Sequence, residues 1–391
     1  MTISINQFAE QLQVPGIREF ANQLVHYPTA VNLTIGQPDF PTPERVKSAG
    51  ILAIENNLTE YSHNAGLLQL REAVASFFYD TYGINYNSDH EIVITSGASE
   101  AIDSTFRTIL SPGDEVILPT PIYLGYAPII ELCGATVVYL DTTDTGFKPT
   151  PESLEDLITP KTKAILFNFP TNPTGVTLNK KEMDELVGVL KRHEIFVLSD
   201  EIYSENTFGA KHVSFAQYEE IHDRVFLIHG LSKSHSMTGW RIGYVLGPAQ
   251  YMETVLKVHL YNSICASLPS QYAAIEALTN CRDVPAEMNI AYEERLEYVY
   301  QRLVKMGLDV VKPSGAFYIF PSIKKFNIDS YTLATRLLKE ADVAVVPGVA
   351  FSQHADDFLR ISYAYSMPVL EEGMNRLERF FIKITQELKG E

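Results

Sequence analysis

A lysine and an arginine stand eight residues apart in HGLSKSHSMTGWRIGYVLG, residues 229–247, which also holds four glycines and the only tryptophan. Lys233 follows an apolar run, so we expect it at the end of a buried strand. Most lysines are solvated charges. An amine that is partly desolvated and close to other cations instead has a lowered pKa and can form a Schiff base. Lys233 is therefore a candidate for covalent chemistry, and Arg241 is a candidate for binding an oxyanion through two bonds at once.

A second charged side chain, Asp200 in FVLSDEIYSE, also comes at the end of an apolar run. A buried carboxylate needs a partner. One interpretation is a helix N-cap, a role that Asp fills well and that is favoured for this residue alone. The other is a salt bridge to the protonated ring nitrogen of a bound heterocycle.

The string SGAS, residues 96–99, is predicted to close a strand and open a helix. Backbone N–H groups and the positive end of the helix dipole bind anions there, phosphate above all. A tight turn with serine capping is the alternative, and for this string alone it is favoured. The glycine-rich fingerprints of dinucleotide-binding and Walker loops are absent.

Further polar residues follow the ends of other predicted strands. Arg360 in FLRISYAYS is either an oxyanion ligand or a strand-edge salt bridge. Asn172 and Gly175 in PTNPTG, Tyr123 in PTPIYLGY, and Tyr203 complete a polar ring. Each of these taken alone is typical of a turn or of an aromatic at the edge of a core.

Short apolar runs alternate with amphipathic segments through the middle of the chain, which predicts a buried parallel sheet covered by helices. Helices are expected at about residues 100–110 and 125–133. The polar strings follow the carboxyl ends of the predicted strands, which form the ligand-binding edge of an open α/β sheet. The strings SGAS, PTPIY, NFPTNPTG, SDEIY and HGLSK are therefore expected around one crevice.

The pattern changes after about residue 280, where a long charged helix precedes strands at 315–323 and 358–366. This predicts a smaller α+β domain. We assign residues 45–285 to a large domain, and residues 1–44 and 286–391 to the small one. The first forty residues lack a strand-and-helix rhythm and are expected to pack on the small domain or across the cleft.

Composition limits the classes of partner and the location. With 391 residues, 46% hydrophobic and 20% charged, the chain is long enough for two domains and is typical of a globular protein. A net charge of -17 argues against nucleic acid and anionic membrane surfaces. Three widely spaced cysteines fit neither a disulfide framework nor a metal site, so we predict a cytoplasmic protein without a metal. No targeting or membrane-spanning segment is recognisable.

In order along the chain, nine strings together resemble the class I aminotransferases of fold type I, which use pyridoxal 5′-phosphate. The resemblance covers essentially the whole chain, and its strength lies in the number and order of the strings rather than in any one of them. It implies an α/β fold with a mostly parallel central sheet and a smaller α+β domain. The strings are IGQPDF, YSHNAGLLQLREAV, ITSGASEA, PIYLGY, NPTG, SDEIY, SK followed by MTGWRIGY, PSGAFY, and FLRISYA.

The resemblance implies roles around the cofactor ring. Lys233 would be joined covalently to the cofactor, and Asp200 would pair with the pyridine nitrogen. Asn172 and Tyr203 would hydrogen-bond the 3′-oxygen, and Tyr123 would stack on the ring. An incoming amino acid would displace Lys233, whose free amine would remove the Cα proton, so that amino groups are exchanged in a ping-pong reaction.

Oxyanion binding is implied at both ends of the site. Arg360, with Gly36 and Asn172, would bind the α-carboxylate of the substrate. Because Tyr61 would reach in from a second subunit, a homodimer is expected. The phosphate ligands would be Ala98, Ser99, Ser232, Arg241 and that Tyr61.

Two departures from the family pattern bear on the substrate. Ser99 stands where bacterial aspartate aminotransferases of this subgroup carry a lysine for the distal carboxylate, and Gly230 stands where relatives often have serine. The strings VPGIREF, LSKSHSMTGWRIGY and GLDVVKPSGAFYIFPSIK are most similar to N-acetyl-LL-diaminopimelate aminotransferases of lysine biosynthesis, with glutamate and 2-oxoglutarate as one pair. The alternatives are an aspartate or aromatic aminotransferase, a carbon–sulfur β-lyase, and a binding or regulatory protein that kept the fold.

Overall fold

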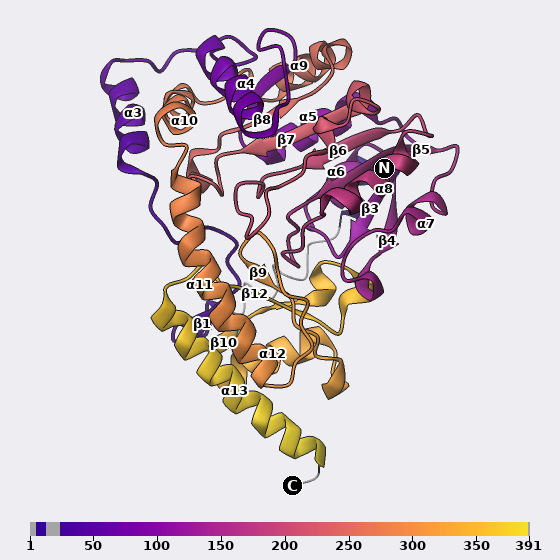
Figure 1. Ribbon diagram of the computed structural model, residues 1–391, viewed down its shortest axis with the longest axis vertical. Helices are drawn as coiled ribbons and strands as arrows, with labels where there is room; N and C mark the ends of the chain where they lie inside the picture. Colours follow the sequence, from indigo (N-terminus) through magenta and orange to yellow (C-terminus); the bar gives the residue numbers. More distant parts are fainter. Residues whose placement is uncertain (1–4, 13–23, 390–391) are drawn as a thin grey trace.

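The computed structural model describes residues 5–12 and 24–389 (Figure 1). The string VPGIREF lies outside the described residues. Within them, a large sheet with its helices occupies the upper part of Figure 1, and a smaller group of strands and long helices occupies the lower part. Helix α13 (Met367–Lys389) extends to the bottom of the picture.

The large sheet has seven strands in the order β2-β8-β7-β6-β5-β3-β4. All neighbouring strands are parallel except at β8, which is antiparallel to both β2 and β7. The strands that pair around β6 are almost fully buried, as their continuous apolar sequences require. The strands are β2 (Ile92–Thr95), β3 (Glu115–Thr120), β4 (Thr136–Asp141), β5 (Thr162–Asn168), β6 (Phe196–Asp200), β7 (Val225–Gly230) and β8 (Gly243–Leu246).

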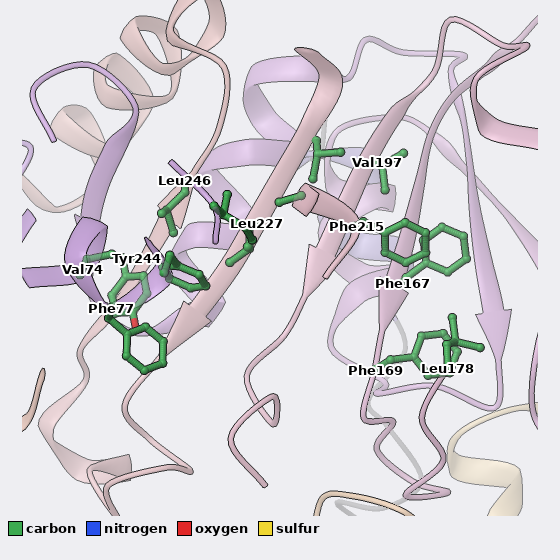
Figure 2. Packing of buried hydrophobic residues seen from close by; sticks show 14 of the residues in the cluster. Val74, Phe77, Phe167, Phe169, Leu178, Val197, Phe215, Leu227, Tyr244 and Leu246 are labelled. Atoms are coloured by element: carbon green, nitrogen blue, oxygen red, sulfur yellow. The ribbon is translucent and has the colours of Figure 1, made fainter. Parts of the chain in front are cut away.

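Helices cover both faces of this sheet because successive strand residues point to opposite sides. Val197 and Leu227 pack with α4, α8 and α10 on one face, whereas Leu198 and Phe226 pack with α5, α6 and α9 on the other. Figure 2 shows the first face, where Val74 and Phe77 of α4 lie beside Leu227, Tyr244 and Leu246. The helices of this part are α3 (Glu44–Glu55), α4 (Leu68–Tyr82), α5 (Ala98–Ile109), α6 (Tyr126–Leu132), α7 (Pro151–Glu155), α8 (Lys180–Leu190), α9 (Ala249–Ser263) and α10 (Leu268–Asn280).

The smaller part has its own core, formed by α11, α12, α13 and short strands. Strands β11, β12 and β9 form one antiparallel sheet, and β1 near the amino terminus pairs in parallel with β10. Helix α1 (Gln7–Gln11) contacts α6 of the large part. The elements are β1 (Val31–Asn32), β9 (Tyr318–Ile319), β10 (Val343–Ala344), β11 (Val346–Pro347), β12 (Leu359–Ser362), α11 (Val284–Lys305), α12 (Ser330–Ala341) and α13 (Met367–Lys389).

Among the described residues, seven short 3₁₀ helices connect these elements, at Thr143–Thr145, Phe215–Gln217, His222–Arg224, Thr238–Trp240, Lys324–Phe326, Gly348–Ala350 and Gln353–Ala355. The predicted mostly parallel sheet flanked by helices is confirmed, and the helices expected at 100–110 and 125–133 are α5 and α6. The boundary of the two domains at residues 45–285 stays a prediction. None of the helices among the described residues is long and apolar enough to cross a membrane.

The antiparallel strand β8 lies between β2 and β7 and determines which strand ends share one edge of the sheet. Because β2 and β7 are both antiparallel to β8, they run parallel to each other and to β6, β5 and β3. The carboxyl ends of these five strands therefore share one edge of the sheet, and each of the five polar strings predicted to meet starts at this edge.

Candidate active site

A cavity of about 520 Å³ opens at this edge, between the large sheet and the smaller part. Its wall includes every residue to which the family resemblance gave a role, except Tyr61. Those residues are Gly36, Ala98, Ser99, Tyr123, Asn172, Asp200, Tyr203, Ser232, Lys233, Arg241 and Arg360.

Lys233 lies in the turn that follows β7, and its ammonium group donates a 2.6 Å hydrogen bond to the carbonyl oxygen of Gly36. The pKa of Lys233 is lowered to about 8, mainly by burial and then by the positive charges of Arg360 and Arg241, against the opposing effect of Asp200. An amine with this pKa is partly neutral near neutral pH, which is the form that attacks an aldehyde.

Asp200 is the last residue of β6 and is 4% exposed. Tyr126 donates a 2.6 Å hydrogen bond to Oδ2, and the backbone N–H of Ile202 donates a 3.1 Å bond to Oδ1. Burial raises the pKa of Asp200 to about 6, and these two hydrogen bonds oppose the rise. No α-helix begins at Asp200, so the N-cap interpretation of this residue is wrong.

The amino terminus of α5 and Arg241 form one corner of the cavity. The first N–H groups of the helix, at Ala98 and Ser99, have no intrahelical acceptor, and the N-cap Gly97 has no side chain to bond them. The predicted capping of this helix by a serine side chain is therefore wrong. The Ser96 N–H instead donates to the Glu100 carboxylate at 2.5 Å.

Arg241 reaches this corner because its own backbone is in the left-handed region, with φ at 53°. Its guanidinium donates to the carbonyl oxygens of Thr238 at 3.0 Å and Ser96 at 3.4 Å. The φ of Gly97 is 83°, and a Cβ there would collide with the Arg241 guanidinium. The tight approach of the two segments thus requires glycine at position 97.

Arg360 of β12 lies at the opposite end of the cavity and is 5% exposed. Its Nη1 donates to Asn172 Oδ1 at 2.8 Å, and its Nη2 donates to the Thr34 carbonyl oxygen at 2.5 Å. The guanidinium carbon is 4.6 Å from the ring centre of Tyr318 and 5.0 Å from that of Phe351. Within the described residues its Nε has no hydrogen-bond partner and no carboxylate forms an ion pair with it, so the strand-edge salt bridge is wrong.

Tyr318, which sequence reasoning did not single out, connects several of these groups. Its hydroxyl is 2.8 Å from that of Tyr203, and its ring stacks against Arg360. A Cβ at Gly36 would collide with the Tyr318 hydroxyl. The string PSGAFY contains this tyrosine, but only the pairing of β9 with β12 brings it to the cavity.

Two glycines and one tyrosine that the sequence singled out lie away from the cavity wall. Tyr61 is 79% exposed and does not line the cavity of its own chain. Gly175 is also absent from the wall; it packs under the Tyr318 carbonyl oxygen, 2.6 Å from where a Cβ would lie, so its place in the polar ring is wrong. A Cβ at Gly230 would lie 2.9 Å from the Ile242 carbonyl oxygen, which explains why this chain has no serine there.

The charges of the cavity are unusual for an acidic chain. Among the described wall residues the cations are Lys233, Arg241 and Arg360, and each donates to uncharged oxygens rather than to a carboxylate. The chain carries 48 acidic residues, but among the described wall residues Asp200 is the only carboxylate. Such a wall fits a ligand that brings its own anionic groups at both ends.

The profile of the family described as "Aminotransferase class I and II" matches residues 28–377, and the chain belongs to this family. It is a pyridoxal phosphate-dependent aminotransferase, as the resemblance implied. The chain is 52% identical over 379 residues to the "Probable N-acetyl-LL-diaminopimelate aminotransferase" of Bacillus subtilis strain 168, covering 97% of this chain and 96% of the relative.

Other relatives carry different names. The chain is 40% identical over 353 residues to "Aromatic-amino-acid aminotransferase 2" of Thermococcus litoralis, covering 89% of this chain and 91% of the relative. Among solved structures, the aspartate aminotransferase from Thermus thermophilus with maleate superimposes with a TM-score of 0.91 at 33% identity, over 97% of this chain and 100% of that one. The aromatic aminotransferase from Pyrococcus horikoshii gives 0.89 at 38% identity, over 93% and 99%.

The residues of the cavity fit pyridoxal phosphate. A phosphate needs N–H donors and a guanidinium, which the α5 corner has; an aldehyde needs a partly neutral amine, which Lys233 has; and a pyridinium needs a buried carboxylate, which Asp200 has.

Proposed function

We propose that this enzyme exchanges the amino group of N-acetyl-LL-2,6-diaminopimelate with 2-oxoglutarate, glutamate being the other amino acid of the ping-pong pair. The name of the 52% identical relative and its coverage of both chains support this substrate. The observation that carries the chemistry is the convergence of three cations without carboxylate partners on one cavity that also holds the buried Asp200.

When bound, pyridoxal phosphate supplies an aldehyde that captures the substrate amine and a ring that accepts the electron pair released at Cα. Lys233 would hold the cofactor covalently, and its amine, once displaced by the substrate, would take the proton from Cα and deliver it to the aldehyde carbon of the cofactor. Gly36 orients this amine through its carbonyl oxygen. Asp200 holds a proton on the ring nitrogen, because a buried carboxylate favours a cationic partner.

The remaining residues bind and orient the cofactor and the substrate. Tyr203 and Asn172 donate to the ring 3′-oxygen, and Tyr123, which is 40% exposed at the cavity, covers the ring face. Arg360 binds the α-carboxylate with the donor capacity that Asn172 and Thr34 leave free. The phosphate is bound by the N–H groups and side chains of Ala98, Ser99, Ser232 and Arg241.

A homodimer in the cytoplasm completes the proposal. Tyr61 is 79% exposed, and α3 close by in sequence exposes Ile51, Leu52 and Ile54 at 53%, 54% and 59%. Large apolar side chains exposed together on one helix favour a protein interface. In such a dimer Tyr61 would reach the phosphate in the second subunit's site, as the family resemblance implies.

A second candidate substrate class is the aromatic amino acids. The wall of the cavity includes the apolar side chains of Ile35, Ile102, Leu124 and Phe351, and Ser99 leaves no lysine for a distal carboxylate. These features favour a side chain that is large and partly apolar.

Two assays test the proposal. Adding L-glutamate to the purified holoenzyme should convert the bound cofactor to pyridoxamine phosphate, seen as loss of absorbance of the aldehyde form, whereas release of pyruvate and ammonia from cystathionine would indicate a β-lyase. An acceptor screen with glutamate as donor should then give the highest kcat/KM with the acetylated 2-amino-6-ketopimelate. If oxaloacetate or phenylpyruvate turns over well and that acceptor is inert, the lysine-pathway substrate is wrong.

A further inference from the structure

Tyr126 belongs to the cavity wall, and within the described part of the chain its hydroxyl has one hydrogen-bond partner, Asp200. Tyr126 is the first residue of α6, is 1% exposed, and donates its 2.6 Å hydrogen bond to Asp200 Oδ2. Its ring meets that of Tyr123 edge to face, with ring centres 5.3 Å apart. One short helix therefore begins with a residue that touches both a buried carboxylate and a cavity-lining aromatic.

The two oxygens of Asp200 have different donors. The N–H of Ile202 donates to Oδ1 from the same strand end, and Tyr126 donates to Oδ2 from the start of α6, 74 residues away in sequence. The backbone carbonyl of Asp200 accepts a 3.0 Å bond from the Asn168 side chain. The carboxylate plane is thereby fixed before any ligand arrives, and Tyr126 is the only side chain among the described residues that hydrogen-bonds a carboxylate oxygen of Asp200.

We propose that Tyr126 is a positioning residue for the amino transfer: its hydroxyl fixes the orientation of the Asp200 carboxylate and keeps the shared proton on the cofactor's ring nitrogen. This inference rests on the proposed function. None of the roles implied by the family resemblance includes Tyr126, which acts only through Asp200.

The physical reason lies in the basicity of a buried carboxylate. Burial raises the pKa of Asp200, and hydrogen bonds to its charged form lower it again. The other ionisable groups facing it are Glu201, which raises the pKa, Lys233, which lowers it, and the neutral phenols of Tyr123 and Tyr203. Without the Tyr126 hydroxyl the carboxylate becomes more basic and draws the proton away from a ring nitrogen. A ring that has lost this positive charge accepts the Cα electron pair less readily.

The test compares Tyr126→Phe with wild type and with Tyr86→Phe. Tyr86 is a matched control because its buried hydroxyl has no hydrogen-bond partner among the described residues and it does not line the cavity. Each protein is reconstituted with cofactor labelled with ¹⁵N in the ring, and the ¹⁵N chemical shift, the cofactor dissociation constant, kcat and KM are measured. Circular dichroism melting checks that each variant folds.

For Tyr126→Phe we expect the ¹⁵N shift to move toward the unprotonated value, the dissociation constant to rise, and kcat to fall about tenfold or more with KM for glutamate nearly unchanged. Tyr86→Phe should match wild type in all four. Replacing Tyr126 with 3-fluorotyrosine, a stronger donor of nearly the same size, should move the ¹⁵N shift the opposite way. This second variant keeps the test decisive if Tyr126→Phe does not fold.

A double-mutant cycle with Asp200→Ala separates a positioning role from a general packing role. If Tyr126 acts through Asp200, adding Tyr126→Phe to Asp200→Ala should reduce kcat little further. Full additivity of the two losses, or a ¹⁵N shift in Tyr126→Phe equal to that of wild type, would overturn the inference. If wild type itself neither binds the cofactor nor reacts with glutamate, the proposed function fails instead, so the two failures are distinct.

Discussion

The two arginines at opposite ends of the cavity are held in opposite ways. Arg360 is buried, stacked between two aromatic rings and bonded to partners from two other segments. Arg241 is exposed, and its place is set by a left-handed backbone and two carbonyl oxygens, one of them 3.4 Å away. The α-carboxylate end is therefore preorganised by side-chain packing, and the phosphate end by backbone geometry.

The difference follows from what each end must bind. A substrate enters and leaves in every half-reaction, so its ligand has to be in place beforehand, because ordering a free arginine at each turnover costs affinity. A phosphate that stays bound through both half-reactions can itself order an exposed guanidinium and close the gap to the α5 amino terminus. Changes at the two ends should then affect different measurements.

Removing the amine between the two ends should have the largest effect. Lys233→Ala leaves both arginines and Asp200 in place, so phosphate and carboxylate can still bind. We expect kcat to fall about 10⁴-fold or more, since both the covalent link and the proton transfer depend on this amine. Stopped-flow absorbance with L-glutamate measures the rate, and mass spectrometry after borohydride reduction should find no cofactor joined to this variant. Exchange at the wild-type rate would refute the assignment of Lys233.

The preorganised end is tested by Arg360→Lys, which keeps the charge but loses the planar fork. We expect kcat/KM for glutamate to fall roughly tenfold to a hundredfold, in line with the ~1.5–3 kcal/mol of a hydrogen bond to a charged group. The absorbance of the bound cofactor should not change. The control is Arg336→Lys on α12, whose partners are Glu340 and Glu387. A variant with normal kcat/KM but weakened cofactor binding would reverse the roles of the two ends.

The backbone-built end is tested by Arg241→Gln. The other phosphate donors, the α5 N–H groups, remain, so the dissociation constant of the cofactor should rise only about tenfold. At saturating cofactor, KM for glutamate should match wild type. Arg107→Gln at the opposite end of the same helix, where the arginine pairs with Asp103 at 2.9 Å, is the control. Fluorescence titration of the apoprotein measures both, and equal affinities of wild type and Arg241→Gln would contradict the proposal.

Most of the candidate site could be predicted from the sequence because its residues follow strand ends. Lys233, Asp200 and Asn172 each come after a buried apolar run, and parallel strands bring such positions together whatever their order. The strings that resemble the family then assign a role to each residue. Both kinds of signal can be read from short stretches of the sequence.

The sequence did not single out Tyr126 and Tyr318, because their roles depend on contacts with residues far away in the chain. Tyr126 bonds a carboxylate 74 residues away, and Tyr318 is carried to Tyr203 by a two-residue strand. A tyrosine at the start of a helix or in a short apolar run reads as core in any sequence. The insertion of β8 between β2 and β7 was likewise not predictable, since apolar runs do not state their direction.

The smallest expected effect is on the pKa of Lys233, which the two arginines lower to different extents. In the apoprotein the Lys233 pKa is about 8, and after burial the charge of Arg360 lowers it more than that of Arg241 does. Removing a neighbouring positive charge favours the ammonium form, so Arg360→Gln should raise this pKa, and Arg241→Gln should raise it less. Competitive labelling with acetic anhydride across pH, read at Lys233 by mass spectrometry, gives each midpoint, with the urea-unfolded chain as reference. The order follows from geometry: a buried charge is screened little, whereas an exposed one is screened by water and salt. If Arg241→Gln produced the larger rise, the exposed arginine would have to lie closer to the amine than the structure places it.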